Sequence, residues 1–167
     1  MLALEKKLLY STALFSDDDH RKYRYILTRC WDIGRFKLVW VMLNPSKADE
    51  NRNDATIRRC MGFASAWGYG GIEVYNLFAY VSTYPEMLMK VKNPVGPKND
   101  DVLKNIPRDR DVMVAWGNVN PAFSERITKV QSLLNRNLFC MGCTKLGNPK
   151  HPVRLASSTQ LTLWRKV

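Results

Sequence analysis

Three polar side chains follow apolar runs that have the character of buried strands, and their chemistry suits the recognition of a planar heterocycle. Asn44 comes directly after the apolar run 36–43, Asn76 lies near the end of the run 72–78, and His151 lies in a polar loop further along the chain. A carboxamide offers a hydrogen-bond donor beside an acceptor, and the N–H of a histidine ring can stabilise an oxyanion as it forms. We therefore predict one site built from two amides and an imidazole.

Each of these residues also has a structural interpretation. Asn-Pro is a common opening of a turn, so Asn44 before Pro45 could simply redirect the chain, and a lone histidine such as His151 is often structural. What favours a site is that all three residues lie where an apolar segment gives way to a polar one.

The elements that would position these residues predict an α/β fold in a single domain, residues 1–167. Two strand-like runs, 8–15 and 23–29, are separated by an acidic turn and predict a β-hairpin. After the buried strand at 36–43, Thr56 has the character of a helix N-cap. Further strands are expected at 72–78, 112–116 and 138–141, and helices at 85–91, 100–106, 121–134 and 157–165.

Strands that alternate with helices favour a mainly parallel sheet. We expect a three-layer α/β/α sandwich, with helices on both faces of that sheet and the N-terminal hairpin attached. Such sheets bind ligands where loops leave the carboxyl ends of the strands, which is where Asn44, Asn76 and His151 are expected. The fold therefore supports the interpretation as a site.

The motifs at the strand ends resemble those of the uracil-DNA glycosylase superfamily, and so imply a glycosylase-like fold. In order, they are Leu-Asn-Pro-Ser at 43–46, Asn76, Ala-Trp-Gly at 115–117, and His151 followed by Pro152. More closely, nearly the whole chain resembles the DUF1643 family of small bacterial and phage proteins. The segments that match this family are 23–25, 42–49, 54–59, 67–71, 76–79, 94–100 and 147–152.

The glycosylase resemblance implies a role for each residue of the site. Asn44 would position the attacking water, Asn76 would read the edge of the base, and His151 would support the base as it leaves as an anion.

The chain departs from the superfamily's pattern at several positions. Met42 stands where Gly is usual, and Asn44 and Ser46 stand where the uracil-specific branch has an Asp and a Tyr that excludes thymine. Val153 follows His151 and Pro152 where a Ser is usual, and no clear wedge motif follows. The resemblance therefore implies a pocket open to 5-substituted bases rather than strict uracil specificity.

Other side chains are candidates for the same reaction. Asp54 could act as a general base for the water, although it could equally cap the helix that follows. Phe78 and Trp116 could stack on a base, and Ser46 could line its pocket. Phosphate contacts are expected from Arg58 and Arg59 near the start of that helix, and from Lys145, Gly147 and Lys150 in the loop before His151.

The net charge indicates a polyanion as partner. The chain has 26 Lys and Arg against 15 Asp and Glu, which gives a net charge of +11 and a pI of about 9.7. Beyond Val112 the only acidic residue is Glu125, so one end of the molecule is expected to be positive. DNA, single- or double-stranded, is the expected partner, although a solubilising surface would show the same excess.

Several classes of protein are excluded by what the sequence lacks. No apolar run approaches the roughly 20 residues of a transmembrane helix, and no secretory signal is recognisable, so we expect a cytoplasmic protein without a membrane partner. The sequence leaves the oligomeric state open, with a monomer favoured. Walker, dinucleotide-binding and nucleophile-elbow motifs are absent. Cys140 and Cys143 have the spacing of a metal knuckle, but a second close pair is missing. Buried thiols are therefore expected rather than a zinc or iron–sulfur site, and no cofactor is required.

These features and the resemblance together predict a DNA glycosylase-like hydrolase that removes a modified base flipped out of the DNA. Two alternatives stay open: a non-catalytic nucleic-acid-binding module on the same fold, and an enzyme that acts on a free nucleoside or nucleotide. Salt dependence separates the last from the other two, because DNA releases many counterions on binding and a small substrate releases few.

Overall fold

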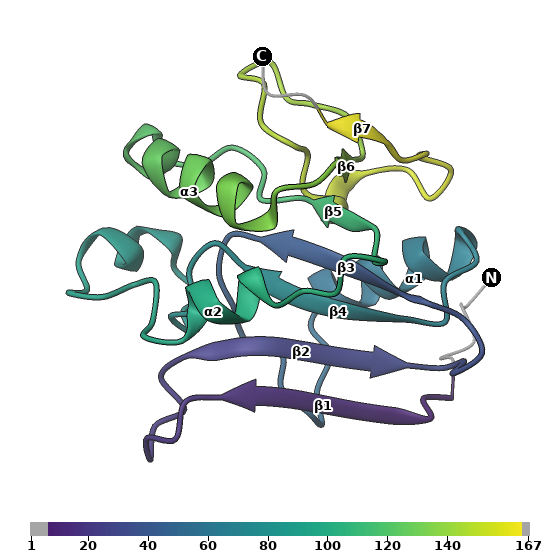
Figure 1. The fold of residues 1–167 in the computed structure, drawn as a ribbon, viewed down its shortest axis with the longest axis horizontal. Coiled ribbons are helices and arrows are strands. Elements are labelled where there is room, and N and C mark those ends of the chain that lie inside the picture. Colours follow the sequence, from purple (N-terminus) through teal and green to yellow (C-terminus); the bar gives the residue numbers. More distant parts are fainter. Residues whose placement is uncertain (1–6, 165–167) are drawn as a thin grey trace.

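The fold is built on one seven-stranded sheet, seen in a computed structural model that describes residues 7–164 (Figure 1). The strands stand in the order β1-β2-β4-β3-β5-β6-β7. The central strands β4, β3, β5 and β6 run parallel to one another, whereas β1, β2 and β7 pair antiparallel with their neighbours. The strands are β1 (Tyr10–Phe15), β2 (Arg24–Cys30), β3 (Lys37–Met42), β4 (Gly71–Asn76), β5 (Val112–Val114), β6 (Leu138–Cys140) and β7 (Thr162–Trp164).

This sheet confirms a mixed α/β fold and corrects the expectation of a mainly parallel sheet. Three of the six strand pairings are antiparallel. The predicted hairpin is confirmed, and it is one source of the difference, because its second strand β2 joins the sheet antiparallel to β4. The other source is β7, which adds an antiparallel strand at the opposite edge.

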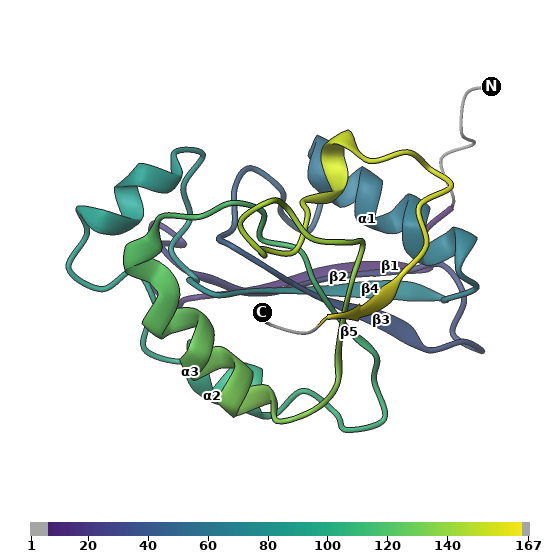
Figure 2. The same ribbon diagram turned by 90° about the horizontal axis from the view of Figure 1, so that it is seen from above.

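Helices lie against both faces of the sheet (Figure 2). The pleat of β3 explains the two cores, because successive side chains of a strand point to opposite faces. Trp40 belongs to the core beneath the first helix, and Val41 belongs to the core beneath the other two. The helices are α1 (Ala55–Ala66), α2 (Asn99–Lys104) and α3 (Ser124–Leu134), and the short 3-10 turns are η1 (Pro85–Met89), η2 (Pro121–Phe123) and η3 (Pro152–Arg154).

The start of α1 differs from the sequence prediction. Asp54, not Thr56, is the N-cap: its carboxylate accepts a hydrogen bond from the backbone N–H of Ile57 at 2.9 Å, and the helix begins at Ala55. A carboxylate at this position also interacts favourably with the positive end of the helix dipole. The helix predicted at 121–134 likewise begins as the 3-10 turn η2, and the one predicted at 85–91 is the 3-10 turn η1.

The C-terminal segment forms a strand where we predicted a helix at 157–165, so that prediction is wrong over the described residues; Arg165 lies outside them. β7 pairs antiparallel with β6, with Leu138 opposite Trp164. The ring of Trp164 is buried edge-on to Trp116, with 5.2 Å between ring centroids. The pairing covers the open edge of β6 and adds a large aromatic side chain to the core, and these tertiary contacts override the local helical preference.

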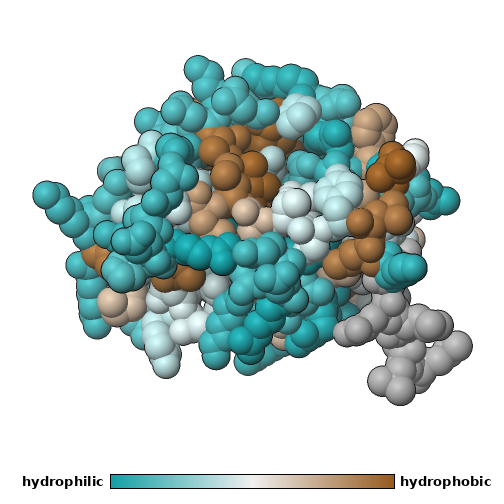
Figure 3. Space-filling model, turned by 90° about the horizontal axis from the view of Figure 1, so that it is seen from below, coloured by the Kyte–Doolittle hydropathy of each residue, from teal (hydrophilic) through white to brown (hydrophobic). Residues whose placement is uncertain are grey.

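The opposite edge of the sheet, formed by β1, faces the viewer in Figure 3. Apolar side chains gather there in separate areas of an otherwise hydrophilic surface (Figure 3). The exposed large hydrophobic residues of the first two strands and their flanks include Leu9, Tyr10, Leu14, Ile33 and Phe36. Within residues 7–164, no helix is long and apolar enough to span a bilayer.

Candidate functional site

A cavity of about 940 Å³ opens at the carboxyl ends of the central strands β3, β4 and β5. Its wall comes from the loops that follow these strands, the start of α1, the turn η1 and the segment around η3. The structure brings six of the residues singled out from the sequence into this wall: Asn44, Ser46, Asp54, Asn76, Trp116 and His151. The rule that parallel sheets bind ligands at strand ends thus describes where the cavity lies.

Asn76 is the most deeply buried of these polar residues. It ends β4, and only 1% of its surface is exposed. Its backbone carbonyl accepts a hydrogen bond at 3.1 Å from the carboxamide of buried Asn99, which also donates to the carbonyl of Leu77 at 3.2 Å. The side-chain Nδ2 of Asn76 is buried without a hydrogen-bond partner among the described residues. Because buried amide groups are nearly always paired, this donor is available to a ligand.

Asn44 connects two loops of the cavity wall. Its Nδ2 donates to the carbonyl of Pro45 at 3.0 Å and to the carbonyl of Ser82 at 2.8 Å. The side-chain nitrogen of Asn44 therefore has the structural role that the interpretation of Asn44 as a turn residue expects. Its Oδ1 accepts no hydrogen bond from the described part of the chain, and Asn44 lines the cavity.

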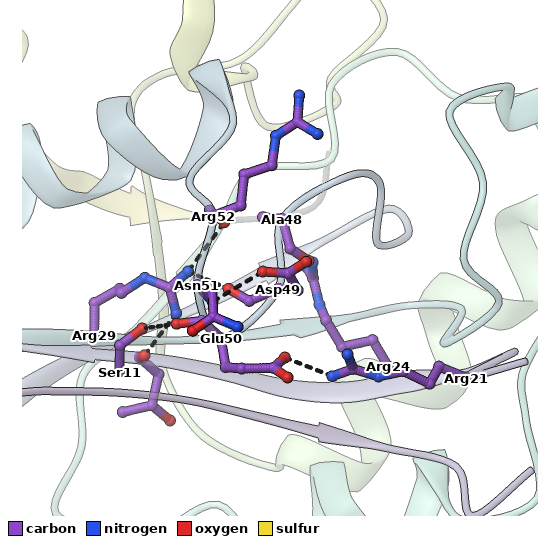
Figure 4. Close-up of polar contacts among 10 residues, drawn as sticks. Ser11, Arg21, Arg24, Arg29, Ala48, Asp49, Glu50, Asn51 and Arg52 are labelled. Atoms are coloured by element: carbon purple, nitrogen blue, oxygen red, sulfur yellow. Dashed lines mark hydrogen bonds and ion pairs between the residues drawn. The ribbon is translucent and has the colours of Figure 1, made fainter. Parts of the chain in front are cut away.

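The loop 48–52, which leads to Asp54, is tied to β2 through Arg24 and Arg29 (Figure 4). Arg29 donates from Nε to Oδ1 of Asn53 at 2.7 Å and from Nη2 to the carbonyls of Asp49 and Arg52. The loop is also held by a hydrogen bond from the Ser11 hydroxyl to the Glu50 carbonyl, an ion pair between Arg21 and Glu50, and a hydrogen bond from Arg24 to the carbonyl of Ala48. Oδ1 of Asp54 accepts the helix-cap hydrogen bond, and Asp54 also lines the cavity.

His151 is neutral and presents one N–H. Its Nδ1 accepts a hydrogen bond from the backbone N–H of Val153 at 3.4 Å, so the proton of the neutral ring is on Nε2. Burial lowers the pKa of His151 from its usual 6.5, and the negative charge of Asp54 opposes that shift. Gly117 makes room for the ring: its φ is +71°, and a Cβ there would lie 3.3 Å from Cβ of His151. Gly117 of the Trp-Gly motif therefore lies close against His151, and both residues line the cavity.

Replacement of His151 by Gln should make the protein less sensitive to acid. The wild-type pKa is lowered in the folded state, so the neutral ring contributes stability above pH 6.5, and this contribution is lost as the pH falls through the lowered pKa. Protonation also removes the acceptor that caps η3. Urea unfolding at pH 7 and at pH 5 measures this: the loss of stability between the two should be smaller in His151→Gln. An equal loss in both proteins would contradict the assignment of a neutral, partly buried ring.

Six of the sequence candidates lie outside the cavity wall, and three of these belong to the core or to α1. Phe78 is buried and packs on Phe123, with 4.7 Å between ring centroids, so its ring belongs to the core. Arg59 donates to the carbonyls of Pro152 and Leu155 and holds the segment that carries His151. Arg58 is exposed and donates to the carbonyl of Asn53 at 2.8 Å.

The remaining phosphate candidates lie on the loop that precedes His151. Lys145 and Lys150 are both exposed there. Gly147 adopts φ +77°, and a Cβ at this position would meet nothing within 4 Å, so the turn is open to an approaching ligand. This loop joins the cavity wall through Asn148, whose Nδ2 donates to Oδ1 of Asn118 at 3.4 Å.

Sequence reasoning missed several cavity residues. The charged ones are Arg24, Glu86, Lys90 and Arg154. For Arg24 a signal existed, because an arginine within a strand of apolar and aromatic residues is unusual unless it has a partner.

The expectation of buried thiols is confirmed for Cys30, Cys60 and Cys140 and is wrong for Cys143, which is exposed. In the part of the chain that the structure describes, no three His, Cys, Asp or Glu side chains cluster as metal ligands.

Comparison with known protein families gives one match, to a family described as a protein of unknown function (DUF1643), over residues 24–153. The chain belongs to the DUF1643 family. No curated protein and no solved structure matches it. The six sequence-derived cavity residues of this DUF1643 protein, from Asn44 to His151, all lie within the matched segment, and so does Arg24.

Proposed function

We propose that this protein binds DNA, takes a modified base into the cavity and hydrolyses the bond between that base and its sugar. The observation that carries the proposal is the meeting of Asn44, Asp54, Asn76 and His151 in one cavity at the strand ends. These are the amides, carboxylate and imidazole that the glycosylase resemblance and the chemistry of base excision require. The finer description of the fold as a glycosylase-like sandwich is part of the same proposal.

In the proposed reaction, water attacks the sugar carbon C1′. Oδ1 of Asn44 and Oδ2 of Asp54 orient the water, and Asp54 takes its proton as the new O–C1′ bond forms. The C1′–N bond breaks, and its electron pair leaves with the base. Nε2–H of His151 donates a hydrogen bond to the oxygen on which the negative charge gathers, while the carboxamide of Asn76 pairs with the edge of the base.

The size of the cavity supports a substituted base as the ligand. Its volume of about 940 Å³ is near the upper end of ordinary ligand pockets. Ser46, a small residue, lines the wall at the position where the uracil-specific glycosylases have a Tyr. Room for a substituent on the base follows from both observations.

Reversal of the charges on Lys145 and Lys150 together should weaken binding to duplex and single-stranded DNA alike. Both side chains are exposed on the loop next to the cavity, and phosphate contacts carry little sequence information. We expect the slope of log K against log salt to become shallower by about 0.7–0.9 for each phosphate that the variant no longer neutralises. Filter binding over a salt series measures it.

The matched control is charge reversal of Lys104 and Lys129, which are exposed on α2 and α3 and do not line the cavity. It changes the net charge by the same amount and should reduce affinity less. If the two double variants show the same reduction in affinity and in slope, DNA contacts would not be concentrated on the loop 143–150.

The excision step itself is tested by incubating the protein with DNA that contains single modified bases and then with alkali, which cleaves abasic sites. Alkali-dependent cleavage at the modified position supports the proposal. Binding to DNA without cleavage for any base would support the binding-module alternative instead.

A second candidate function, an enzyme that acts on a free nucleotide, is favoured by one observation. The guanidinium of Arg24 lies in the wall of the cavity, where it could hold a phosphate. Weak dependence of substrate affinity on salt would support this candidate over DNA excision.

A further inference from the structure

Arg24 is a buried cation in the cavity wall without an ion-pair partner among the described residues. Only 3% of its surface is exposed. Its Nη1 donates to the carbonyl of Ala48 at 2.6 Å, whereas Nε is buried with no hydrogen-bond partner and Nη2 donates to no described residue. Within residues 7–164, no carboxylate lies within ion-pairing distance of this guanidinium; Asp54 and Asp49 act on it only from further away.

Arg29, on the same strand, shows what a structural arginine looks like in this protein. It is as deeply buried, with 1% of its surface exposed. Its guanidinium donates from Nε to Asn53, from Nη1 to the carbonyl of Thr28, and from Nη2 to the loop carbonyls. It does not line the cavity.

Nε of Arg110 and Nη2 of Arg126 are also buried without a hydrogen-bond partner among the described residues, but each of these arginines has an ion pair with a carboxylate, that of Asp109 or Asp100. Within residues 7–164, Arg24 combines an unpaired buried donor and a place in the cavity wall with the lack of any such ion pair.

A charge buried without a partner costs several kcal/mol, so buried charges are normally paired. Burial lowers the pKa of Arg24 to about 10, and the group therefore keeps its charge at neutral pH. Two further buried donors without a partner among the described residues, Nδ2 of Asn76 and Nε1 of Trp116, belong to residues of the same wall. These three unpaired donors, one of them cationic, fit a ligand that is rich in acceptors and carries negative charge.

The geometry of Arg24 defines the kind of group that fits. Nη1 donates to the carbonyl of Ala48, so the edge of the guanidinium formed by Nε and Nη2 is the one left to bind a ligand. That edge presents two parallel N–H groups, which match the two oxygens of a carboxylate or phosphate. We propose that Arg24 binds an oxyanion of the cavity's ligand, either a carboxylate on the base or the phosphate of a nucleotide. This inference rests on the proposed function for the base as ligand.

The test compares binding of matched anionic and neutral probes by isothermal titration calorimetry. One pair is 5-carboxyuracil and uracil, and the other is thymidine 5′-monophosphate and thymidine. The wild-type protein should prefer the anionic member of at least one pair. Preference within the first pair identifies a carboxylate on the base, and preference within the second pair identifies a phosphate.

Arg24→Gln should reduce that preference by about tenfold or more, since charge-assisted hydrogen bonds are the stronger ones, while affinity for the neutral probe should change little. Arg29→Gln is the matched control: it weakens the same loop and should leave the preference unchanged. Arg24→Lys keeps the charge without the two-pronged edge and should give an intermediate preference, and it serves if the Gln variant fails to fold. A wild-type protein without any anionic preference, or an Arg24→Gln variant that keeps it, overturns the proposal.

The result is separable from that of the proposed function. Release of a base from DNA without any Arg24-dependent preference would leave the proposed function standing and remove this inference. An Arg24-dependent preference for thymidine 5′-monophosphate without base release would support this inference and contradict base excision from DNA. It would favour a free nucleotide as substrate.

Discussion

Replacement of His151 by Ala should slow base release by about 100- to 1,000-fold and leave DNA affinity nearly unchanged. The ring is neutral, its proton is on Nε2, and its expected partner is the charge that develops only as the base leaves. Interactions made only in the transition state affect the rate and not the binding of the ground state. Single-turnover base release, with DNA affinity measured in parallel, tests this.

The chain offers a matched control in His20, an exposed residue outside the cavity wall. His20→Ala should release the base at the wild-type rate. If His151→Ala weakened DNA binding as much as it slowed release, the ring would be a contact for the DNA and not a support for the leaving base.

Replacement of Asn76 by Ala should abolish discrimination between bases with little loss of stability. The Asn76 carboxamide lines the cavity and has an unpaired buried donor, so that atom makes no stabilising hydrogen bond within the protein. A ligand that pairs with it gains on the order of 1–3 kcal/mol over one that leaves it unpaired, which corresponds to about 5- to 150-fold in selectivity. Competition between DNAs that carry different bases measures the selectivity.

Asn99→Ala is the informative comparison, because Asn99 holds the backbone of Asn76 and Leu77 through hydrogen bonds. We expect Asn99→Ala to lower the melting temperature and Asn76→Ala to leave it unchanged or raise it. A large loss of stability in Asn76→Ala, with selectivity preserved, would make Asn76 a structural residue of the strand end.

The first six strands and the location of the cavity were predictable because they depend on local patterns. The apolar run 36–43 is typical of a buried strand, and it became β3 (Lys37–Met42). The polar residues after β3 and at the end of β4 were then bound to lie side by side, since parallel strands present their carboxyl ends at one edge. Asn44 and Asn76 accordingly line one cavity.

The parts that were not predictable depend on contacts between distant segments. Residues 162–164 form a strand because the edge of β6 and the ring of Trp116 accept them, and neither can be read from the segment itself. The different roles of Arg24 and Arg29 likewise depend on distant contacts and could not be predicted from the sequence. They lie only five residues apart on β2 (Arg24–Cys30), yet one is saturated by hydrogen bonds to a loop and the other faces a cavity.

The most direct test of the central claim, that the cavity binds a base and releases it from DNA, is mass spectrometry of free base liberated from DNA. Duplex and single-stranded oligonucleotides, each with one base substituted at the 5-position or otherwise modified, would be incubated with the wild-type protein and with Asp54→Asn. The account predicts that at least one free modified base appears with the wild-type protein, leaving an alkali-labile site, and that Asp54→Asn binds the same DNA but releases about 100-fold less or lower still. Equal release by both proteins, or DNA binding without release of any base, would contradict it.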